Sequence, residues 1–193
     1  MQALDTNCYL AVRQKHSYGF SQLLSGHYRR GQLPDIVSAC LPEELTNVKP
    51  EQFFNSEARE RYYANVDMIN PDRAQGKVVW GFPKGRRQSA AEQDLDAAQR
   101  EFREETGLDY PHDATVVNVT VERIYDLNKQ YIIKYWLVTV PTELPLPAEV
   151  DCPEIAECKW MSYPDLRKVL SPTRLSLLAY FSHRERPMDS QDS

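Results

Sequence analysis

The region that decides the fold lies between residues 85 and 108, where the chain reads GRRQSAAEQDLDAAQREFREETGL. Its apolar residues Leu95, Ala98 and Phe102 fall on one side of a helix drawn at about 100° per residue. This spacing predicts a helix over residues 91–106 with those three side chains buried. Gly107 predicts the end of the helix, because glycine adopts the left-handed conformation found there at little cost.

Three carboxylates share an adjoining face of the predicted helix. Glu101, Glu104 and Glu105 stand at positions i, i+3 and i+4, where Cβ atoms lie about 5–6 Å apart. Like charges repel at this separation, so the cluster does not stabilise the helix by itself. A hard divalent cation would turn the repulsion into ligation, because Mg²⁺ prefers oxygen ligands. The plainer interpretation is a solvated helix face on which Arg100 pairs with Glu104, and the flanking sequence has to decide between the two.

The segments around this helix predict an α/β fold. Residues 130–140 are apolar at both odd and even positions, which is typical of a central strand covered on both faces. Further strands are expected at residues 8–12, 77–82, 114–125 and 157–161, and closing helices at 164–170 and 173–182. Between the first strand and residue 77, helical patterns broken by Pro42 and Pro50 predict a helical insertion over about residues 17–75.

The order of residues 85–108 resembles the signature of the Nudix hydrolase family, G-x5-E-x7-R-E-U-x-E-E-x-G-U, with U a bulky apolar residue. Residues 100–108 match its second half throughout, and Glu92 lies eight residues before Arg100 as the signature requires. One departure is that six residues, not five, separate Gly85 from Glu92. The free energy of closing a loop changes little with one added residue. Glu92 has an alternative role in a capping box with Ser89.

The resemblance implies a Nudix α/β/α sandwich around a mixed sheet, and hydrolysis of a diphosphate with Mg²⁺ or Mn²⁺. It implies that Glu101, Glu104 and Glu105 are metal ligands and that Arg100 is structural, pairing with Glu92. It leaves open which carboxylate takes the proton from water. The candidates for this catalytic role are Glu101, Glu105 and Glu154.

Two further segments resemble mRNA-decapping Nudix enzymes, both those of large DNA viruses and the eukaryotic decapping catalytic subunit. Residues 80–85, WGFPKG, are similar to the sequence that leads into the signature, and this likeness implies that Lys84 and Gly85 face substrate phosphates. Residues 154–160 are similar to the segment that carries an additional glutamate, for which Glu154 is the first choice as a metal ligand and Glu157 the second. The helical insertion also resembles that of the viral enzymes.

The expected substrate is therefore a nucleoside-diphosphate linkage, foremost the 5′ cap of mRNA, with release of 7-methyl-GDP. Arg13 and Lys15 are expected to contact substrate phosphates. Alternatives are a dinucleoside polyphosphate, a nucleotide sugar, a diphosphoinositol polyphosphate, or the triphosphate end of RNA. A catalytically silent binding module is the alternative from another class. Five aromatic residues are candidates for stacking on a base, with no choice made among Tyr18, Phe20, Trp80, Tyr131 and Trp136.

Composition limits the remaining possibilities. The chain of 193 residues contains 20 aromatic residues, too many for a chain that stays disordered, and no apolar run is long enough to span a membrane. The net charge of −5 argues against unspecific coating of nucleic acid but allows a local basic groove. Four cysteines without a CxxC spacing predict free thiols in a reducing compartment, and the expected location is the cytoplasm. One Nudix domain is expected over residues 1–186, with a disordered tail at 187–193 and no protein partner.

Overall fold

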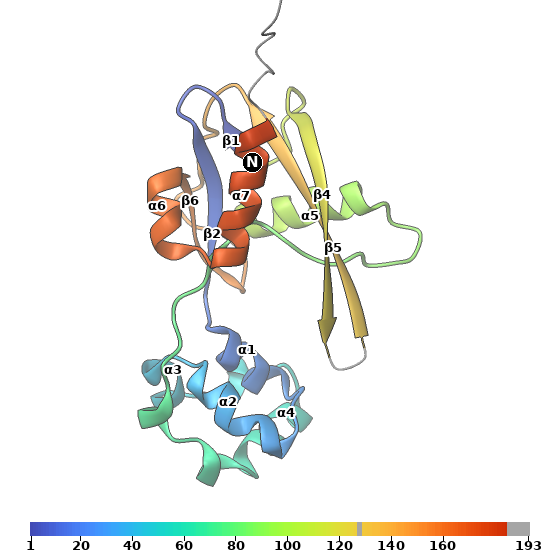
Figure 1. Ribbon diagram of the computed structural model, residues 1–193. Coiled ribbons are helices and arrows are strands. Elements are labelled where there is room, and N and C mark those ends of the chain that lie inside the picture. The colour runs from blue at the N-terminus through green and yellow to red at the C-terminus, as the bar shows by residue number, and fades with distance from the viewer. Residues whose placement is uncertain (127–128, 185–193) are drawn as a thin grey trace, which may run out of the picture. The chain divides into compact units, whose positions relative to one another are not determined.

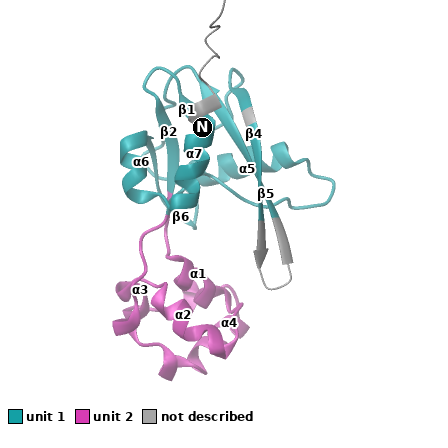
Figure 2. Ribbon diagram, viewed as in Figure 1, with its two compact units in different colours: residues 1–12, 80–193 teal, residues 13–79 magenta. Residues whose placement is uncertain are grey.

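The computed structural model describes residues 1–126 and 129–184 (Figure 1). Contacts divide the chain into two compact units (Figure 2). Unit 1 contains residues 1–12 and 80–193, and unit 2 contains residues 13–79. The predicted insertion, residues 17 to about 75, lies within unit 2, and the predicted tail lies outside the described residues.

Unit 1 is built on a mixed sheet. Its strands are β1 (Gln2–Ala3), β2 (Cys8–Gln14), β3 (Trp80–Gly81), β4 (Thr115–Asp126), β5 (Lys129–Val140) and β6 (Ile155–Ser162). The strands follow the order β3-β2-β1-β5-β4, and β6 also pairs with β2. β1 runs parallel to β5 and antiparallel to β2, and β4 and β5 form a long antiparallel pair. The α/β class and the mixed sheet predicted from the sequence are therefore confirmed.

β5 is an inner strand, as predicted, because β1 and β4 flank it. The expectation that both of its faces are covered is wrong at Ile132. Leu137, Val138 and Val140 are buried, whereas Ile132 is 58% exposed. The sequence shows apolar residues on both faces there, but the antiparallel pair extends beyond the helices that cover the rest of the sheet (Figure 1).

Helices lie on both faces of the sheet (Figure 1). The helices of unit 1 are α5 (Asp94–Thr106), α6 (Tyr163–Val169) and α7 (Pro172–Arg184). Leu166 of α6 and Phe181 of α7 pack with Tyr9 and Ala11 of β2 and Leu137 of β5 in one buried cluster. Burying a side chain such as Leu or Phe contributes about 1.5–3 kcal/mol, so this cluster holds α6 and α7 on the sheet.

The carboxylate helix α5 begins three residues later than predicted. Gln93 is its N-cap residue, so the alternative capping-box role of Glu92 with Ser89 is wrong. The helix ends as predicted, because Gly107 has φ 70° and donates its N–H to the carbonyl of Arg103. The buried stripe is rotated from the predicted one: Ala97 and Phe102 are buried, while Leu95 and Ala98 are only partly so.

Unit 2 is helical. Its helices are α1 (Tyr18–Ser25), α2 (Leu33–Ser38), α3 (Pro42–Thr46) and α4 (Ser56–Tyr63), with 3-10 turns η1 (Arg30–Gln32), η2 (Pro50–Gln52), η3 (Val66–Met68) and η4 (Pro71–Arg73). Phe20, Leu23, Leu33 and Val37 are central to its own buried core. The short helix α3 was not predicted. Unit 2 therefore has a hydrophobic core separate from that of the sheet.

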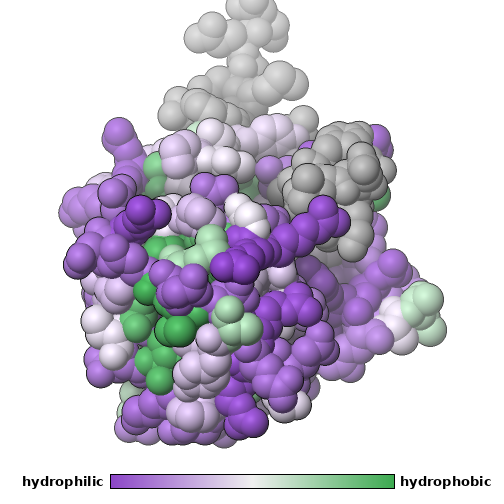
Figure 3. Space-filling view, turned by 90° about the horizontal axis from the view of Figure 1, so that it is seen from below, coloured by the Kyte–Doolittle hydropathy of each residue, from purple (hydrophilic) through white to green (hydrophobic). Residues whose placement is uncertain are grey.

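The face shown in Figure 3 is mainly hydrophilic, with smaller hydrophobic areas. No helix in the described part of the chain has the length and apolar character needed to cross a membrane. The four cysteines are free thiols, as predicted.

Candidate active site

The loop between β3 and α5 is held to the carboxylates of α5 by its own backbone. The N–H of Lys84 donates to Glu105 Oε2 at 2.9 Å, and the N–H of Arg86 donates to Glu101 Oε1 at 3.2 Å. Gly85 lies between these two donors, and the Glu101 carboxylate packs against its backbone. Two carboxylates that are one helical turn apart are therefore oriented by consecutive parts of one loop.

Arg100 is the centre of the ion-pair network on this helix. Its Nε donates to Glu92 Oε1 at 3.0 Å, and its Nη1 donates to Glu101 at 2.8 Å and to Glu104 at 3.1 Å. Its Nη2 donates to the carbonyl of Arg86 at 2.8 Å. Glu92 in turn accepts from the N–H of Gln88 at 2.6 Å. The guanidinium thus ties both ends of the 86–92 loop to the helix, which uses the several fixed donors that only arginine offers.

Glu105 is the most deeply buried carboxylate of the group, with 4% of its surface exposed. Its pKa is raised to about 7, mainly by burial and also by the negative charges of Glu101 and Glu154, against the opposing effects of the N–H and the charge of Lys84. The same interactions show that Glu101, Glu154 and Lys84 are all electrostatic neighbours of Glu105. Glu154 is exposed and immediately precedes β6.

The carboxylate oxygens of this site are the kind of ligand that a hard cation prefers. The neighbouring Lys84 has a charge that suits a phosphate. Within residues 1–126 and 129–184, however, no three His, Cys, Asp or Glu side chains are arranged closely enough to hold a metal ion. Glu101 and Glu104 each direct an oxygen to Arg100, and Glu105 directs one to the loop. Each carboxylate retains a second oxygen for a ligand.

The predicted site residues fall into two groups. Lys84, Gly85, Glu101, Glu105 and Glu154 come together in unit 1 through the contacts described above. Glu104 belongs to the same helix but is half exposed and reaches the others through Arg100.

Arg13 and Lys15, the other predicted phosphate contacts, belong to unit 2. Among the candidate aromatic platforms, Phe20 is buried and Trp80 packs against the core, whereas Tyr18 is 69% exposed. Trp136 is partly buried, and the side chain of Tyr131 lies outside what the structure describes.

Two residues near the site were missed from the sequence. Arg174 of α7 donates Nη1 to the carbonyl of Trp80 at 2.6 Å and so fixes the strand that leads into the loop. Cys158 of β6 is close enough to Glu105 for that charge to add to the effect of burial, which raises the pKa of this thiol to about 12. No sequence signal marked either residue, although Cys158 lies within residues 154–160, because both act through contacts that only the folded sheet creates.

The profile of the NUDIX domain family matches residues 66–181, which include β3, the loop, α5 and the strands that follow.

A protein of Acanthamoeba polyphaga mimivirus named "Putative mRNA-decapping protein" is 31% identical over 123 residues, which are 54% of this chain and 33% of that protein. The chain thus matches about a third of the length of that relative. Two crystal structures of a C. elegans Ap4A hydrolase also match. One, a binary complex, has 26% identity and a TM-score of 0.42 over 55% of this chain and 76% of the other. The second has 25% identity and a TM-score of 0.44 over 56% and 78%.

Proposed function

This chain belongs to the NUDIX domain family, and from that membership we propose that it hydrolyses a nucleoside-diphosphate linkage with the help of Mg²⁺ or Mn²⁺. The observation that carries the proposal is the pairing of two carboxylates with one loop: Glu101 with the N–H of Arg86, and Glu105 with the N–H of Lys84. Glu154 adds a third carboxylate beside them.

A bound divalent ion would neutralise the diphosphate and lower the pKa of the attacking water. We propose Glu101, Glu104, Glu105 and Glu154 as its ligands. The Lys84 ammonium balances negative charge beside Glu105 and would attract a phosphate. A proton leaving the water has Glu101, Glu105 and Glu154 as acceptors, and a carboxylate whose pKa is raised toward neutrality suits that role.

The substrate we propose is the 5′ cap of mRNA, cleaved to release 7-methyl-GDP. Two observations support this choice: the mimivirus relative carries decapping in its name, and residues 80–85 read WGFPKG directly before the carboxylate helix. Arg13 and Lys15 would then contact RNA phosphates from unit 2, within a single Nudix domain that carries unit 2 as its insertion. Free thiols favour a reducing compartment, and we propose the cytoplasm.

The test is incubation of the native protein with cap-labelled RNA and Mn²⁺, with Glu105→Gln in parallel. Release of labelled 7-methyl-GDP by the native protein, with a large loss in the variant, is the expected result. A panel of dinucleoside tetraphosphate, nucleotide sugar, diphosphoinositol polyphosphate and 5′-triphosphorylated RNA is run at equal concentration. Faster turnover of a small nucleotide than of capped RNA would mean that the small nucleotide is the substrate. The proposed hydrolysis of a diphosphate linkage would still hold. No hydrolysis of any of them would overturn the proposal.

A further inference from the structure

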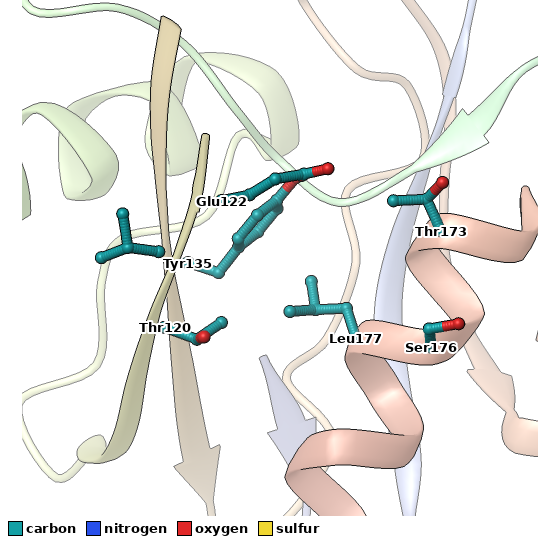
Figure 4. Close-up of a pocket in the computed structure, with 7 residues that line it drawn as sticks. Thr120, Glu122, Tyr135, Thr173, Ser176 and Leu177 are labelled. Carbon is teal, nitrogen blue, oxygen red and sulfur yellow. The ribbon is translucent and has the colours of Figure 1, made fainter. Parts of the chain in front are cut away.

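A cavity of about 210 Å³ lies between the β4–β5 pair and α7 (Figure 4). In Figure 4 Glu122 and Tyr135 lie on the strand side, and Leu177 points from the helix toward the strands. Thr173 and Ser176 complete the lining on the helix side. Thr120 pairs with Tyr135 across the two strands and completes the strand side. None of these residues takes part in the carboxylate network of α5.

The polar centre of the cavity is a carboxylate that is held in place. The hydroxyl of Tyr135 donates to Glu122 Oε2 at 2.8 Å, and both side chains are partly buried. Burial and the nearby Glu122 charge raise the pKa of Tyr135 to about 12, so the hydroxyl remains a donor at neutral pH. An ionised carboxylate accepts about four hydrogen bonds, and Tyr135 supplies one. Glu122 therefore retains acceptor capacity toward the cavity.

The remaining lining residues favour the binding of a flat, uncharged chemical group. Leu177, the ring of Tyr135 and the methyl groups of Thr120 and Thr173 offer apolar surface. A phosphate would face the negative charge of Glu122, and the nearby Arg174, whose charge lowers the pKa of Tyr135, is not among the lining residues and is bonded to the carbonyl of Trp80. A heterocyclic base that carries N–H donors on one edge satisfies both the apolar walls and the carboxylate.

The cavity is connected to the carboxylate site by a short piece of chain. Arg174, which follows Thr173 on α7, is bonded to the carbonyl of Trp80, and Lys84 is bonded to Glu105. The four residue steps from Trp80 to Lys84 span at most about 14 Å. This limit covers the stretch from Trp80 to Lys84, and the side chain of Arg174 spans the remaining gap between α7 and Trp80, so the cavity and the carboxylate site belong to one connected part of unit 1.

We propose that this cavity binds the guanine base of the substrate and that Glu122 accepts hydrogen bonds from its N1–H and 2-amino groups. The inference rests on the proposed function, since it assigns the base of the nucleotide whose diphosphate is cleaved. Adenine presents an acceptor, not a donor, at N1, so it would leave the carboxylate partly unpaired, which is unfavourable in a partly buried site. Guanine is therefore preferred to adenine by hydrogen bonding alone.

The experiment is a calorimetric titration of the full-length protein, in Mg²⁺, with the α,β-methylene analogues of GDP and ADP. These two ligands differ only in the base and are not hydrolysed at that bridge. The native protein is expected to bind the guanine analogue about 5- to 150-fold more tightly, because a bidentate base contact contributes about 1–3 kcal/mol. Glu122→Gln is expected to lose most of that preference. Tyr135→Phe is expected to lose part of it, because the carboxylate is then no longer fixed. Glu149→Gln makes the same chemical change at an exposed position outside the cavity and should preserve the preference.

Equal affinity of the native protein for the two analogues, or an equal loss for both in Glu122→Gln, would overturn the inference. The second result would mean that Glu122 contacts the ribose or supports the fold. The binding test is separate from the test of hydrolysis. A guanine preference that depends on Glu122 would support the assignment of the cavity as a base site even if capped RNA were not cleaved. Cleavage without base preference would reject that assignment and leave the proposed hydrolysis in place.

Discussion

The carboxylate of Glu101 occupies the space that a side chain on residue 85 would need. A Cβ built on Gly85 would lie 1.7 Å from Cδ of Glu101 and 2.1 Å from each of its oxygens. The requirement for glycine here is one of space and not of backbone dihedral angles, since Gly85 is not among the residues with positive φ. The carboxylate lies against the loop and accepts the N–H of Arg86 there, so residue 85 sets the position of a proposed metal ligand.

Gly85→Ala should lower catalytic activity while leaving the protein folded. The added methyl group meets the far end of a flexible side chain, which can rotate away, so the melting temperature should change little. A displaced Glu101 carboxylate would misplace the metal and water, and a shift of about 1 Å can cost on the order of 100-fold in rate. The measurements are kcat on the diphosphate substrate that the native protein cleaves, and thermal unfolding by circular dichroism.

Gly31→Ala is the matched control, because a Cβ at Gly31 meets no atom within 4 Å. It should retain native kcat and melting temperature. If Gly85→Ala kept full activity, Glu101 would not need its observed position, and its assignment as a ligand would have to be withdrawn.

The end of α5 was predictable from the sequence and its beginning was not. Gly107 marks the C-terminus through a local conformational preference, which requires no tertiary contact. The start of α5 depends on the side chain of Glu92, which accepts hydrogen bonds from Arg100 and from the N–H of Gln88 and does not cap the helix. This contact between side chains eight residues apart overrides the capping signal of Ser89 and Glu92.

The candidate active site was also only partly predictable from the sequence. Helical periodicity placed Glu101, Glu104 and Glu105 on one face, and the resemblance to the family signature implied that they are metal ligands. Their hydrogen bonds to the backbone of Lys84 and Arg86 could not be read from the sequence, because a backbone donor has no residue type. The pair formed by Glu122 and Tyr135 was also missed, since it depends on the strand register.

Glu101→Gln and Glu105→Gln should each reduce kcat far more than Glu157→Gln. An amide has one carbonyl oxygen and no negative charge, so it is a poor ligand for a hard cation. Loss of groups that merely support a metal ligand costs about 10–100-fold in metal affinity or activity, so loss of a ligand should exceed this. Activity is measured across an Mn²⁺ titration. Similar losses in all three variants would mean that the metal lies elsewhere.

Arg100→Lys should lower both the melting temperature and kcat. Lysine keeps the positive charge but cannot donate at once to Glu92, Glu101, Glu104 and the carbonyl of Arg86. Arg103→Lys is the control, because Arg103 pairs only with the exposed Asp109 among its described ion pairs. Equal, small effects of the two substitutions on unfolding and turnover would show that the fork of Arg100 is not needed.

Glu44 should make the stability of unit 2 depend on pH. Burial alone would raise its pKa, but hydrogen bonds from His16, Ser17 and Leu41 outweigh burial and hold the pKa below the ordinary value. Ser17 donates its N–H at 2.7 Å and its hydroxyl at 2.5 Å, and Leu41 donates its N–H at 2.8 Å. These bonds join the start of α1 to the start of α3, so their loss should loosen the helical core.

A carboxyl whose pKa is lower in the folded state stabilises that state above its unfolded pKa, here about 4.3 for glutamate. The stabilisation is lost as the pH falls through the lower folded value. Glu44→Gln should therefore melt well below the native protein at about pH 6, where the native carboxyl is ionised, and the difference should shrink as the pH is lowered through the folded pKa of Glu44. Glu43→Gln, at the exposed neighbouring position, should follow the native curve throughout. A difference that stayed constant with pH would show that Glu44 acts through its shape and not through its charge.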